Sequence, residues 1–254
     1  MKTRRGRVIA VASVLLGLAV LAGAGLAFRD RIAREWGRWS ALKVRGKVHF
    51  IGTILPRPPP ISMACDSNCV SLNSAPVYPE DAVYNSNGTL KNVLVYVSAG
   101  LEAKAFPLPS EPVVLEHKGC RYVPHVFGIC ASQPLEIRNG DPTNHNTHFL
   151  PLKNPQINLG MPTSMKIVKR LPRPEPPFRI KCEVHNWESA WCGVFDHPFF
   201  AVTDEKGEYE LKGLPPGKYT LTAWHEKYGV ETQEVHVPWL GARTADFDFG
   251  APVR

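Results

Sequence analysis

One short stretch of the chain concentrates residues that can bind a metal ion. Residues 182–188 read Cys-Glu-Val-His-Asn-Trp-Glu, and upstream of them His145 is followed by Asn146. A thiolate and two imidazoles brought together suit a copper ion that exchanges one electron, because the thiolate favours Cu(I) and imidazole suits Cu(II). The pattern therefore predicts a site for one copper ion on His145, Cys182 and His185.

Each of these residues also has an ordinary structural interpretation. Cys182 could form a disulfide, for example with Cys192, and His145 and His185 could be surface histidines. Cys-x-x-His alone is a weak signal, but the His-Asn pair upstream strengthens it. The copper site and the disulfide are therefore competing expectations for the same thiol.

The segments that must position these residues have the pattern of short β-strands. Residues 47–52 alternate in polarity, and residues 92–97 form a second candidate strand. Further candidates follow at 112–116, 135–138, 178–184 and 191–195. The 24 Pro and 20 Gly of the chain separate them. We therefore expect an all-β chain whose first domain, residues 46–198, is a Greek-key β-sandwich or barrel.

Residues 199–254 form a second β unit. Candidate strands at 207–211, 219–225 and 231–237 alternate in polarity, and Pro215-Pro216-Gly217 is typical of a turn. This pattern resembles the transthyretin-like β-sandwich of carboxypeptidase regulatory-like domains. That resemblance implies a structural or interaction module, and no residues in the unit are arranged for catalysis.

The N-terminus predicts a membrane segment. Residues 8–28 are an unbroken apolar run long enough to cross a bilayer as a helix, and residues 1–7 before it are basic. A cleaved signal peptide is the alternative, with Ala-Gly-Ala at 22–24 as a small-residue site. We expect an uncleaved single-pass anchor in the inner membrane, a juxtamembrane helix or linker over 29–45, and the remaining chain in the periplasm.

Charge and motifs exclude several functions. Residues 1–45 hold ten Lys or Arg against two acidic residues, whereas the remaining chain holds twenty against twenty-one. The exported part is nearly neutral and lacks the basic face that nucleic-acid binding needs. Hydrolase, zinc-protease, phosphate-loop and haem-attachment motifs are also absent from the sequence. We therefore expect an electron carrier or accessory protein rather than an enzyme.

Longer motifs carry a wider resemblance. The segments 119–126, 139–148, 181–187 and 193–204 are similar to those of a bacterial family of exported proteins. These proteins join a cupredoxin-like Greek-key sandwich to a carboxypeptidase regulatory-like tail, and are often labelled plastocyanin-like or methylamine-utilisation proteins. The resemblance runs from about residue 46 to residue 249. It implies copper on His145, Cys182 and His185, with Asn146 helping to fasten the two ligand loops.

Glu188 departs from the pattern that the resemblance implies. Shorter-loop cupredoxins place Met three residues after the second His, and Glu188 stands there. Glu188 could be an axial oxygen ligand that lowers the reduction potential by stabilising Cu(II), it could point to solvent, or the site could have lost copper.

Six cysteines suit an exported protein. The family resemblance implies a Cys69–Cys120 disulfide. A second pair, Cys130–Cys192, is our further expectation, which leaves Cys65 over.

The remaining histidines divide into two groups. His125 and His148 lie within the matching motifs and could form a second site or reach the copper. His117, His197, His225 and His236 are expected to pack or to hydrogen-bond.

Two functions follow from these expectations. The first is a membrane-anchored periplasmic copper protein that carries one electron to or from a respiratory or dehydrogenase partner. The second is a non-redox accessory subunit of a larger membrane complex, in which the metal site is vestigial.

Overall fold

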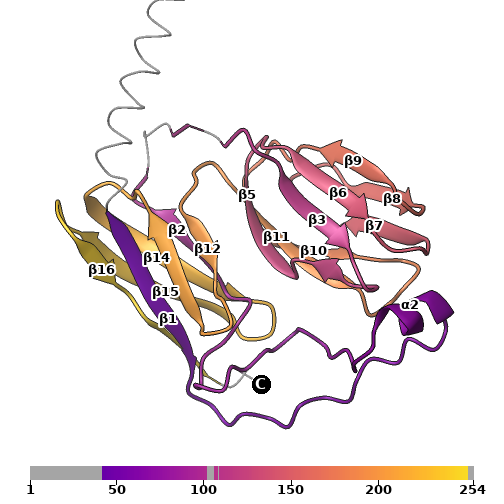
Figure 1. Ribbon diagram of the computed structural model, residues 1–254. Helices are drawn as coiled ribbons and strands as arrows, with labels where there is room; N and C mark the ends of the chain where they lie inside the picture. Colours follow the sequence, from indigo (N-terminus) through magenta and orange to yellow (C-terminus); the bar gives the residue numbers. More distant parts are fainter. Residues whose placement is uncertain (1–41, 102–105, 108, 251–254) are drawn as a thin grey trace, which may run out of the picture.

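Two β-sandwiches make up the part of the chain that the structure describes (Figure 1). This computed structural model describes residues 42–101, 106–107 and 109–250. One short helix, α2 (Ser67–Leu72), accompanies the strands. The expected all-β class is confirmed for these residues. No helix among them is long and apolar enough to span a bilayer, and the segments expected at 1–7 and 8–28 lie outside the described residues.

The first sandwich, here called the terminal sandwich, draws strands from both ends of the described chain. One sheet has the order β13-β1-β16, with β17 also paired to β1, and the other has the order β12-β2-β14-β15. The strands are β1 (Lys43–Phe50), β2 (Leu94–Ala99), β12 (Phe200–Val202), β13 (Glu208–Lys212), β14 (Gly217–His225), β15 (Gly229–Val237), β16 (Ala242–Thr244) and β17 (Phe247–Phe249). Its core includes Val44, Val95, Leu211 and Leu221.

The second sandwich, here called the inserted sandwich, lies between β2 and β12 in the chain. Its sheets have the orders β5-β11-β10-β7-β8 and β4-β3-β6-β9. The strands are β3 (Val113–His117), β4 (Tyr122–Val123), β5 (Val126–Cys130), β6 (Leu135–Asn139), β7 (His145–Phe149), β8 (Ile157–Met161), β9 (Lys166–Lys169), β10 (Glu175–Lys181) and β11 (Ser189–Phe195). Leu115, Ile137, Phe149 and Ile180 pack in its core.

The expected range 46–198 for the first domain needs correction. β1 pairs with β13, with Val44 opposite Leu211, and β2 pairs with β12 and β14. Both early strands therefore belong with the C-terminal strands, and residues 43–45, expected in a linker, begin β1. The alternation of polarity predicts that a segment is a strand, but it does not say which sheet the strand joins.

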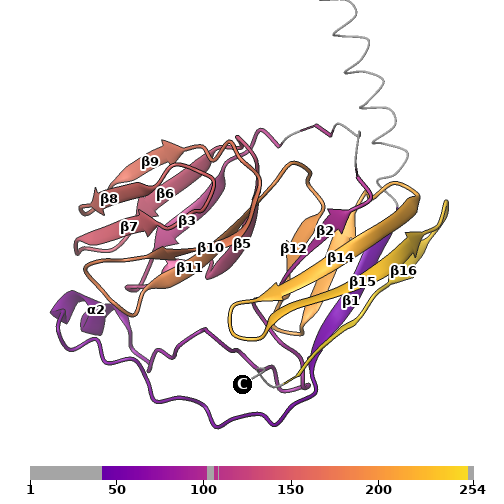
Figure 2. The ribbon, with the colours of Figure 1, turned by 180° about the vertical axis from the view of Figure 1, so that it is seen from behind.

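The two sandwiches pack against each other through apolar side chains. Leu94, Val126 and Phe195 form one buried cluster across the junction. Gly128 on β5 allows β12 to come close, because a Cβ at this position would lie 2.4 Å from the Phe200 ring. Figure 2 shows β5 and β12 side by side at this junction.

The long connection from β1 to β2 crosses to the inserted sandwich. Figure 1 shows it running from the end of β1 to α2 and back. Residues 61–73 of this connection, here called the covering segment, contain α2. The expected Cys69–Cys120 disulfide is confirmed, and it ties the covering segment to the loop between β3 and β4.

The expected Cys130–Cys192 disulfide is wrong. Both cysteines are free and buried. In the parallel β5–β11 pair, Cys192 lies opposite Phe127, and Cys130 lies opposite Phe195. That register separates the cysteines by three residues along the ladder, about 10 Å. The separation exceeds the Cα–Cα distance of about 7 Å that a disulfide can bridge. Cys65 is free and exposed.

Candidate metal centre

The four predicted metal ligands converge at one end of the inserted sandwich. His145 begins β7, Cys182 follows β10, and His185 and Glu188 lie on the turn that leads into β11. One potential ligand atom from each lies within 4.8 Å of those of the other three, and all four residues are buried. The turn is held by two backbone hydrogen bonds, from Cys182 N to the Glu188 carbonyl (3.2 Å) and from Glu188 N to the His185 carbonyl (3.0 Å).

The spacing of the donor atoms fits a single transition-metal ion. His145 Nδ1 lies 3.1 Å from His185 Nδ1. Two nitrogens about 2.0–2.1 Å from one ion lie about 3.1–3.4 Å apart when the angle at the ion is about 100–110°. Cys182 belongs to the same cluster and is free of any disulfide. A set of one thiolate and two imidazoles fits copper.

Backbone amides point at the Cys182 sulfur. Asn146 N lies 3.4 Å from Cys182 Sγ and donates to it, and His185 N donates from 3.3 Å. Hydrogen bonds to a ligand sulfur orient it and tune the metal that it binds. The ligand turn and β7 therefore hold the Cys182 sulfur in place within the cluster.

Asn146 joins the two segments that carry the ligands. Its Oδ1 accepts a hydrogen bond from Glu183 N (3.3 Å), and its Nδ2 donates to the Leu159 carbonyl (3.1 Å) and to Asn158 Oδ1 (2.7 Å). The side chain thus links the start of β7 to the turn after β10 and to β8. This is the place in the structure where the family resemblance puts a fastening residue.

Replacing Asn146 with Ala should weaken copper binding by about 10- to 100-fold, the usual cost of losing a group that orients metal ligands. The Asn146 backbone N–H to Cys182 stays, so the substitution removes only the side-chain link. Titration against a competing chelator measures the change. Asn158→Ala is the matched control, because Asn158 touches Asn146 but not the ligand turn. Equal effects of the two variants would contradict this role.

Glu188 points inward rather than to solvent. Only 1% of its surface is exposed. Its Oε2 lies 3.2 Å from both His117 Nδ1 and His145 Nδ1. Its Oε1 is buried and has no hydrogen-bond partner. A buried carboxylate oxygen without a partner costs free energy, so a group that binds there would stabilise the site.

The cluster is arranged to hold positive charge. Burial opposes the charged form of His145, but its contacts with Asp141, Cys182 and Glu188 outweigh burial and raise its pKa to about 11. Burial likewise disfavours the charged Glu188, yet the imidazoles of His117 and His145 lower its pKa to about 2. A proton on His145 thus balances the surrounding anions, and a bound cation would serve the same purpose.

Three residues that contact the site were not predicted from the sequence to be part of it. His117 stacks on His145, with ring centroids 4.4 Å apart, and also bonds Thr147 Oγ1 (2.8 Å). Asp141 Oδ2 lies 3.1 Å from His145 Nε2. Asp66 Oδ2 lies 3.2 Å from His185 Nε2. The Gly-Asp-Pro at 140–142 signals a turn at Asp141, whereas no local pattern marks Asp66.

His125 and His148 make other contacts. His125 bonds the Glu226 carboxylate and the Ser189 carbonyl at the junction of the sandwiches. His148 bonds Glu183 and Gln156 at the surface. Neither imidazole therefore belongs to the group of potential metal ligands formed by His145, Cys182, His185 and Glu188.

A cavity of about 190 Å³ reaches the site from the Glu188 side. Arg121, His125 and Trp187 also line it. Arg121 Nε is buried without a partner. A bound water takes about 30 Å³, so the cavity has room for several water molecules between the cluster and the surface. The covering segment packs on His185 through Asp66 and Cys69, and Ile61 of the same segment lines the cavity.

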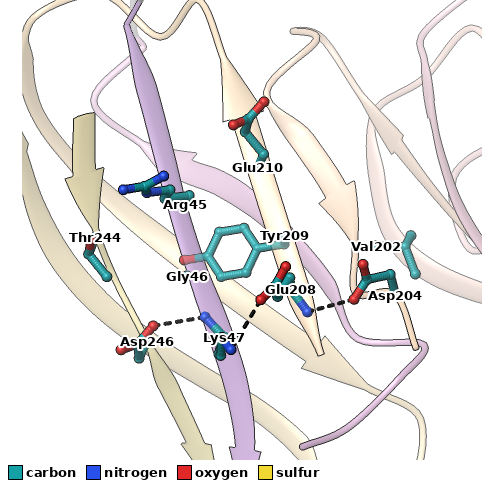
Figure 3. Close-up of a pocket in the computed structure, with 10 residues that line it drawn as sticks. All are labelled: Arg45, Gly46, Lys47, Val202, Asp204, Glu208, Tyr209, Glu210, Thr244 and Asp246. Atoms are coloured by element: carbon teal, nitrogen blue, oxygen red, sulfur yellow. Dashed lines mark hydrogen bonds and ion pairs between the residues drawn. The ribbon is translucent and has the colours of Figure 1, made fainter. Parts of the chain in front are cut away.

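A larger hollow, about 630 Å³, lies on the terminal sandwich, away from the cluster. Figure 3 shows Lys47 between Glu208 and Asp246 in this hollow. Lys47 Nζ pairs with Glu208 (3.1 Å), and the Lys47 N–H donates to Asp246 (2.8 Å). These charged groups pair with one another, and no group of potential metal ligands among the described residues lies in this hollow.

One family model matches the C-terminal part of the chain. The family model of the carboxypeptidase regulatory-like domain matches residues 196–250. No curated protein matches the chain.

Three solved structures are similar to part of the chain. A copper-containing nitrite reductase from Thermus scotoductus SA-01 has 18% identity and a TM-score of 0.32, over 41% of this chain and 25% of that one. A purple cupredoxin from Nitrosopumilus maritimus has 18% identity and a TM-score of 0.25, over 29% and 80%. Amicyanin from Paracoccus versutus has 17% identity and a TM-score of 0.29, over 39% and 96%. Residues 196–250 thus match the family model of the carboxypeptidase regulatory-like domain, and this range includes β12 to β17 of the terminal sandwich.

Proposed function

We propose that the protein binds one copper ion at His145, Cys182, His185 and Glu188 and carries single electrons. The observation that carries this proposal is the convergence of four buried donors, one of which, Glu188, keeps an unpartnered oxygen. Copper bound there supplies a centre that takes up and releases one electron. The chain's own residues hold the ligands still, because β7, β10 and β11 anchor both loops and Asn146 links them.

The setting of this function is also a proposal. The apolar run at 8–28 would anchor the protein in the inner membrane, with both sandwiches in the periplasm beside a respiratory or dehydrogenase partner. The Cys69–Cys120 disulfide supports export, because disulfides persist in oxidising compartments.

The test is copper loading of the full chain. We expect one copper per chain, a thiolate-to-Cu(II) absorption band and a reversible one-electron wave in voltammetry. Full-length protein that takes up no copper, or that binds copper without reversible redox chemistry, would overturn the proposal.

A second function, a non-redox accessory subunit with a vestigial site, has one observation in its favour. The Glu188 carboxylate already bonds His117 and His145, so the cluster is partly satisfied without a metal. Under this alternative, Cys182→Ala would leave assembly with the partner complex intact, whereas removal of the anchor or of the C-terminal domain would abolish it.

Replacing Glu188 with Met should raise the reduction potential of the copper-loaded protein by on the order of 100 mV. A unit charge about 3 Å from the ion contributes about 5 kcal/mol at an effective dielectric of about 20, and relaxation removes part of that. About 1.4 kcal/mol corresponds to about 59 mV for one electron. Because the carboxylate favours Cu(II), its loss favours Cu(I), and protein-film voltammetry measures the difference.

Glu183→Gln is the matched control for this change. Glu183 lies on the same turn but pairs with Lys181 and His148 at the surface. We expect it to leave the potential nearly unchanged. A potential that stays constant or falls in the Glu188→Met protein would show that Glu188 does not act on the copper.

A further inference from the structure

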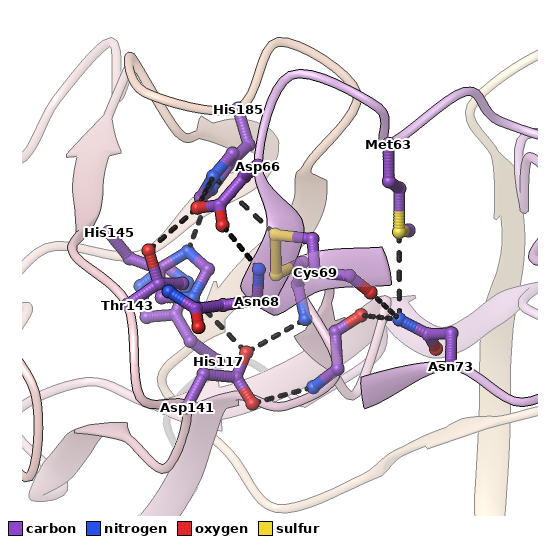
Figure 4. Close-up of a disulfide and its surroundings, with 12 residues drawn as sticks. Met63, Asp66, Asn68, Cys69, Asn73, His117, Asp141, Thr143, His145 and His185 are labelled. Carbon is purple, nitrogen blue, oxygen red and sulfur yellow. Dashed lines mark hydrogen bonds and ion pairs between the residues drawn. A yellow bond between two sulfur atoms is a disulfide. The ribbon is translucent and has the colours of Figure 1, made fainter. Parts of the chain in front are cut away.

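The Cys69–Cys120 disulfide lies directly against one of the proposed copper ligands. Cys69 Sγ is 3.6 Å from His185 Nε2. His185 therefore faces two groups of donors, with Nδ1 toward His145 and Nε2 toward the disulfide and Asp66. Figure 4 shows the disulfide, Asp66 and His185 together beside α2. One donor atom from each of Cys69, Cys120 and His185 lies within 4.8 Å of the other two.

We propose that reduction of this disulfide creates a second metal site, which takes Cu(I) on Cys69 Sγ, Cys120 Sγ and His185 Nε2. Two thiolates and an imidazole are donors that suit a soft monovalent ion. Met63 packs in the same buried cluster as the two cysteines, and its thioether is another soft donor. This site goes beyond the proposed electron-transfer centre and does not require that centre to be loaded.

The two cysteines are held in place by contacts other than their disulfide. Asn73 Nδ2 donates to the Cys69 carbonyl (2.8 Å) and to the Gly119 carbonyl (3.1 Å). Asp141 accepts from Gly119 N and Cys120 N, both at 2.8 Å. Trp187 Nε1 donates to the Cys120 carbonyl (3.0 Å). Because these bonds remain when the disulfide is cleaved, the two thiols stay close enough to bind one ion.

Reduction of the Cys69–Cys120 disulfide is balanced when a dithiol is the reductant. The two thiols of the reductant become its own disulfide, the Cys69–Cys120 bond breaks, and two electrons with two protons pass to the cysteine sulfurs. Each cysteine releases its proton when its sulfur binds the ion. Asp66 Oδ2 gives up its contact with His185 Nε2 but keeps the hydrogen bond from Thr143 Oγ1 (2.7 Å).

The experiment measures Cu(I) uptake by full-length Cys182→Ala protein, in which the first site lacks its thiolate. Protein is tested before and after treatment with a phosphine reductant, which is removed under anaerobic conditions. Bound Cu(I) is measured by competition with a chromogenic chelator, and thiols are counted in denaturant. We expect reduction to free two further thiols and to add one tightly bound Cu(I) per chain. The three remaining thiols, Cys65, Cys130 and Cys192, are present in both states and cannot cause the difference.

X-ray absorption at the copper edge of the reduced, Cu(I)-loaded protein then identifies the ligands without replacing either cysteine. We expect two sulfur neighbours and one nitrogen, and at least a 10-fold loss of Cu(I) affinity in His185→Ala but not in His148→Ala. Equal Cu(I) uptake by the oxidised and reduced proteins would overturn the proposal. So would a disulfide that resists reduction in the folded protein, or a circular dichroism spectrum that shows unfolding on reduction. Because Cys182 is absent throughout, these outcomes are independent of whether the first site carries electrons.

Discussion

Copper-loaded protein in which Cys182 is replaced with Ala should have no thiolate-to-Cu(II) absorption band. With the Cys69–Cys120 disulfide intact, it should also bind Cu(I) about 1,000-fold more weakly, or worse, because loss of a supporting group alone typically costs 10- to 100-fold. Cys182 supplies the sulfur of the cluster and accepts hydrogen bonds from two backbone N–H groups. Absorption spectra and chelator competition measure both effects.

Cys192→Ala is the matched control for this prediction. Cys192 is also free, buried and part of the same sandwich, but it lies outside the cluster of metal donors found among the described residues. We expect Cys192→Ala to keep the band and the affinity. An absorption band that survives in Cys182→Ala would assign the sulfur ligand to another residue.

Replacing both Cys69 and Cys120 with Ser should lower the free energy of unfolding of the inserted sandwich by about 4 kcal/mol. The chain-entropy model gives this value for a disulfide that closes a loop of about 50 residues, and the two cysteines are 51 residues apart. Urea unfolding measures the change. The fluorescence of Trp187, isolated by replacing the five other tryptophans of the chain with Phe, is a suitable probe of this sandwich, because Trp187 Nε1 donates to the Cys120 carbonyl.

Cys65→Ser is the control for the loss of a sulfur, since Cys65 is free and exposed. We expect it to change the free energy of unfolding by less than about 0.5 kcal/mol. A loss below about 1 kcal/mol in the double variant would show that the covering segment is held mainly by its hydrogen bonds, such as those of Asn73.

Sequence reasoning located the candidate site because its ligands sit in two short, recognisable segments. Cys182, His185 and Glu188 share one turn, and His145 stands beside Asn146 at the start of a strand. The burial of Glu188 and its contacts with two imidazoles required the fold, because His117 and His145 come from separate strands. Asp66 reaches His185 from 119 residues away in the chain, and no local pattern predicts such a contact.

The errors in the fold have a related cause. Polarity alternation in residues 47–52 indicates a strand but not that β1 pairs with β13, more than 160 residues later. Cys130 and Cys192 do lie on neighbouring strands, yet the register of β5 and β11 keeps them apart. Pairing partner and register depend on long-range packing, which a single sequence does not reveal.

X-ray absorption at the copper edge of the full chain loaded with one copper ion tests the central claim most directly. We predict one sulfur neighbour at about 2.2–2.3 Å, two imidazole nitrogens at about 2.0 Å, in line with usual metal–ligand lengths, and one carboxylate oxygen neighbour from Glu188. Loss of the sulfur neighbour in Cys182→Ala would complete the assignment. A spectrum with only nitrogen and oxygen neighbours in the wild-type protein, or a full chain that retains no copper, would contradict the account.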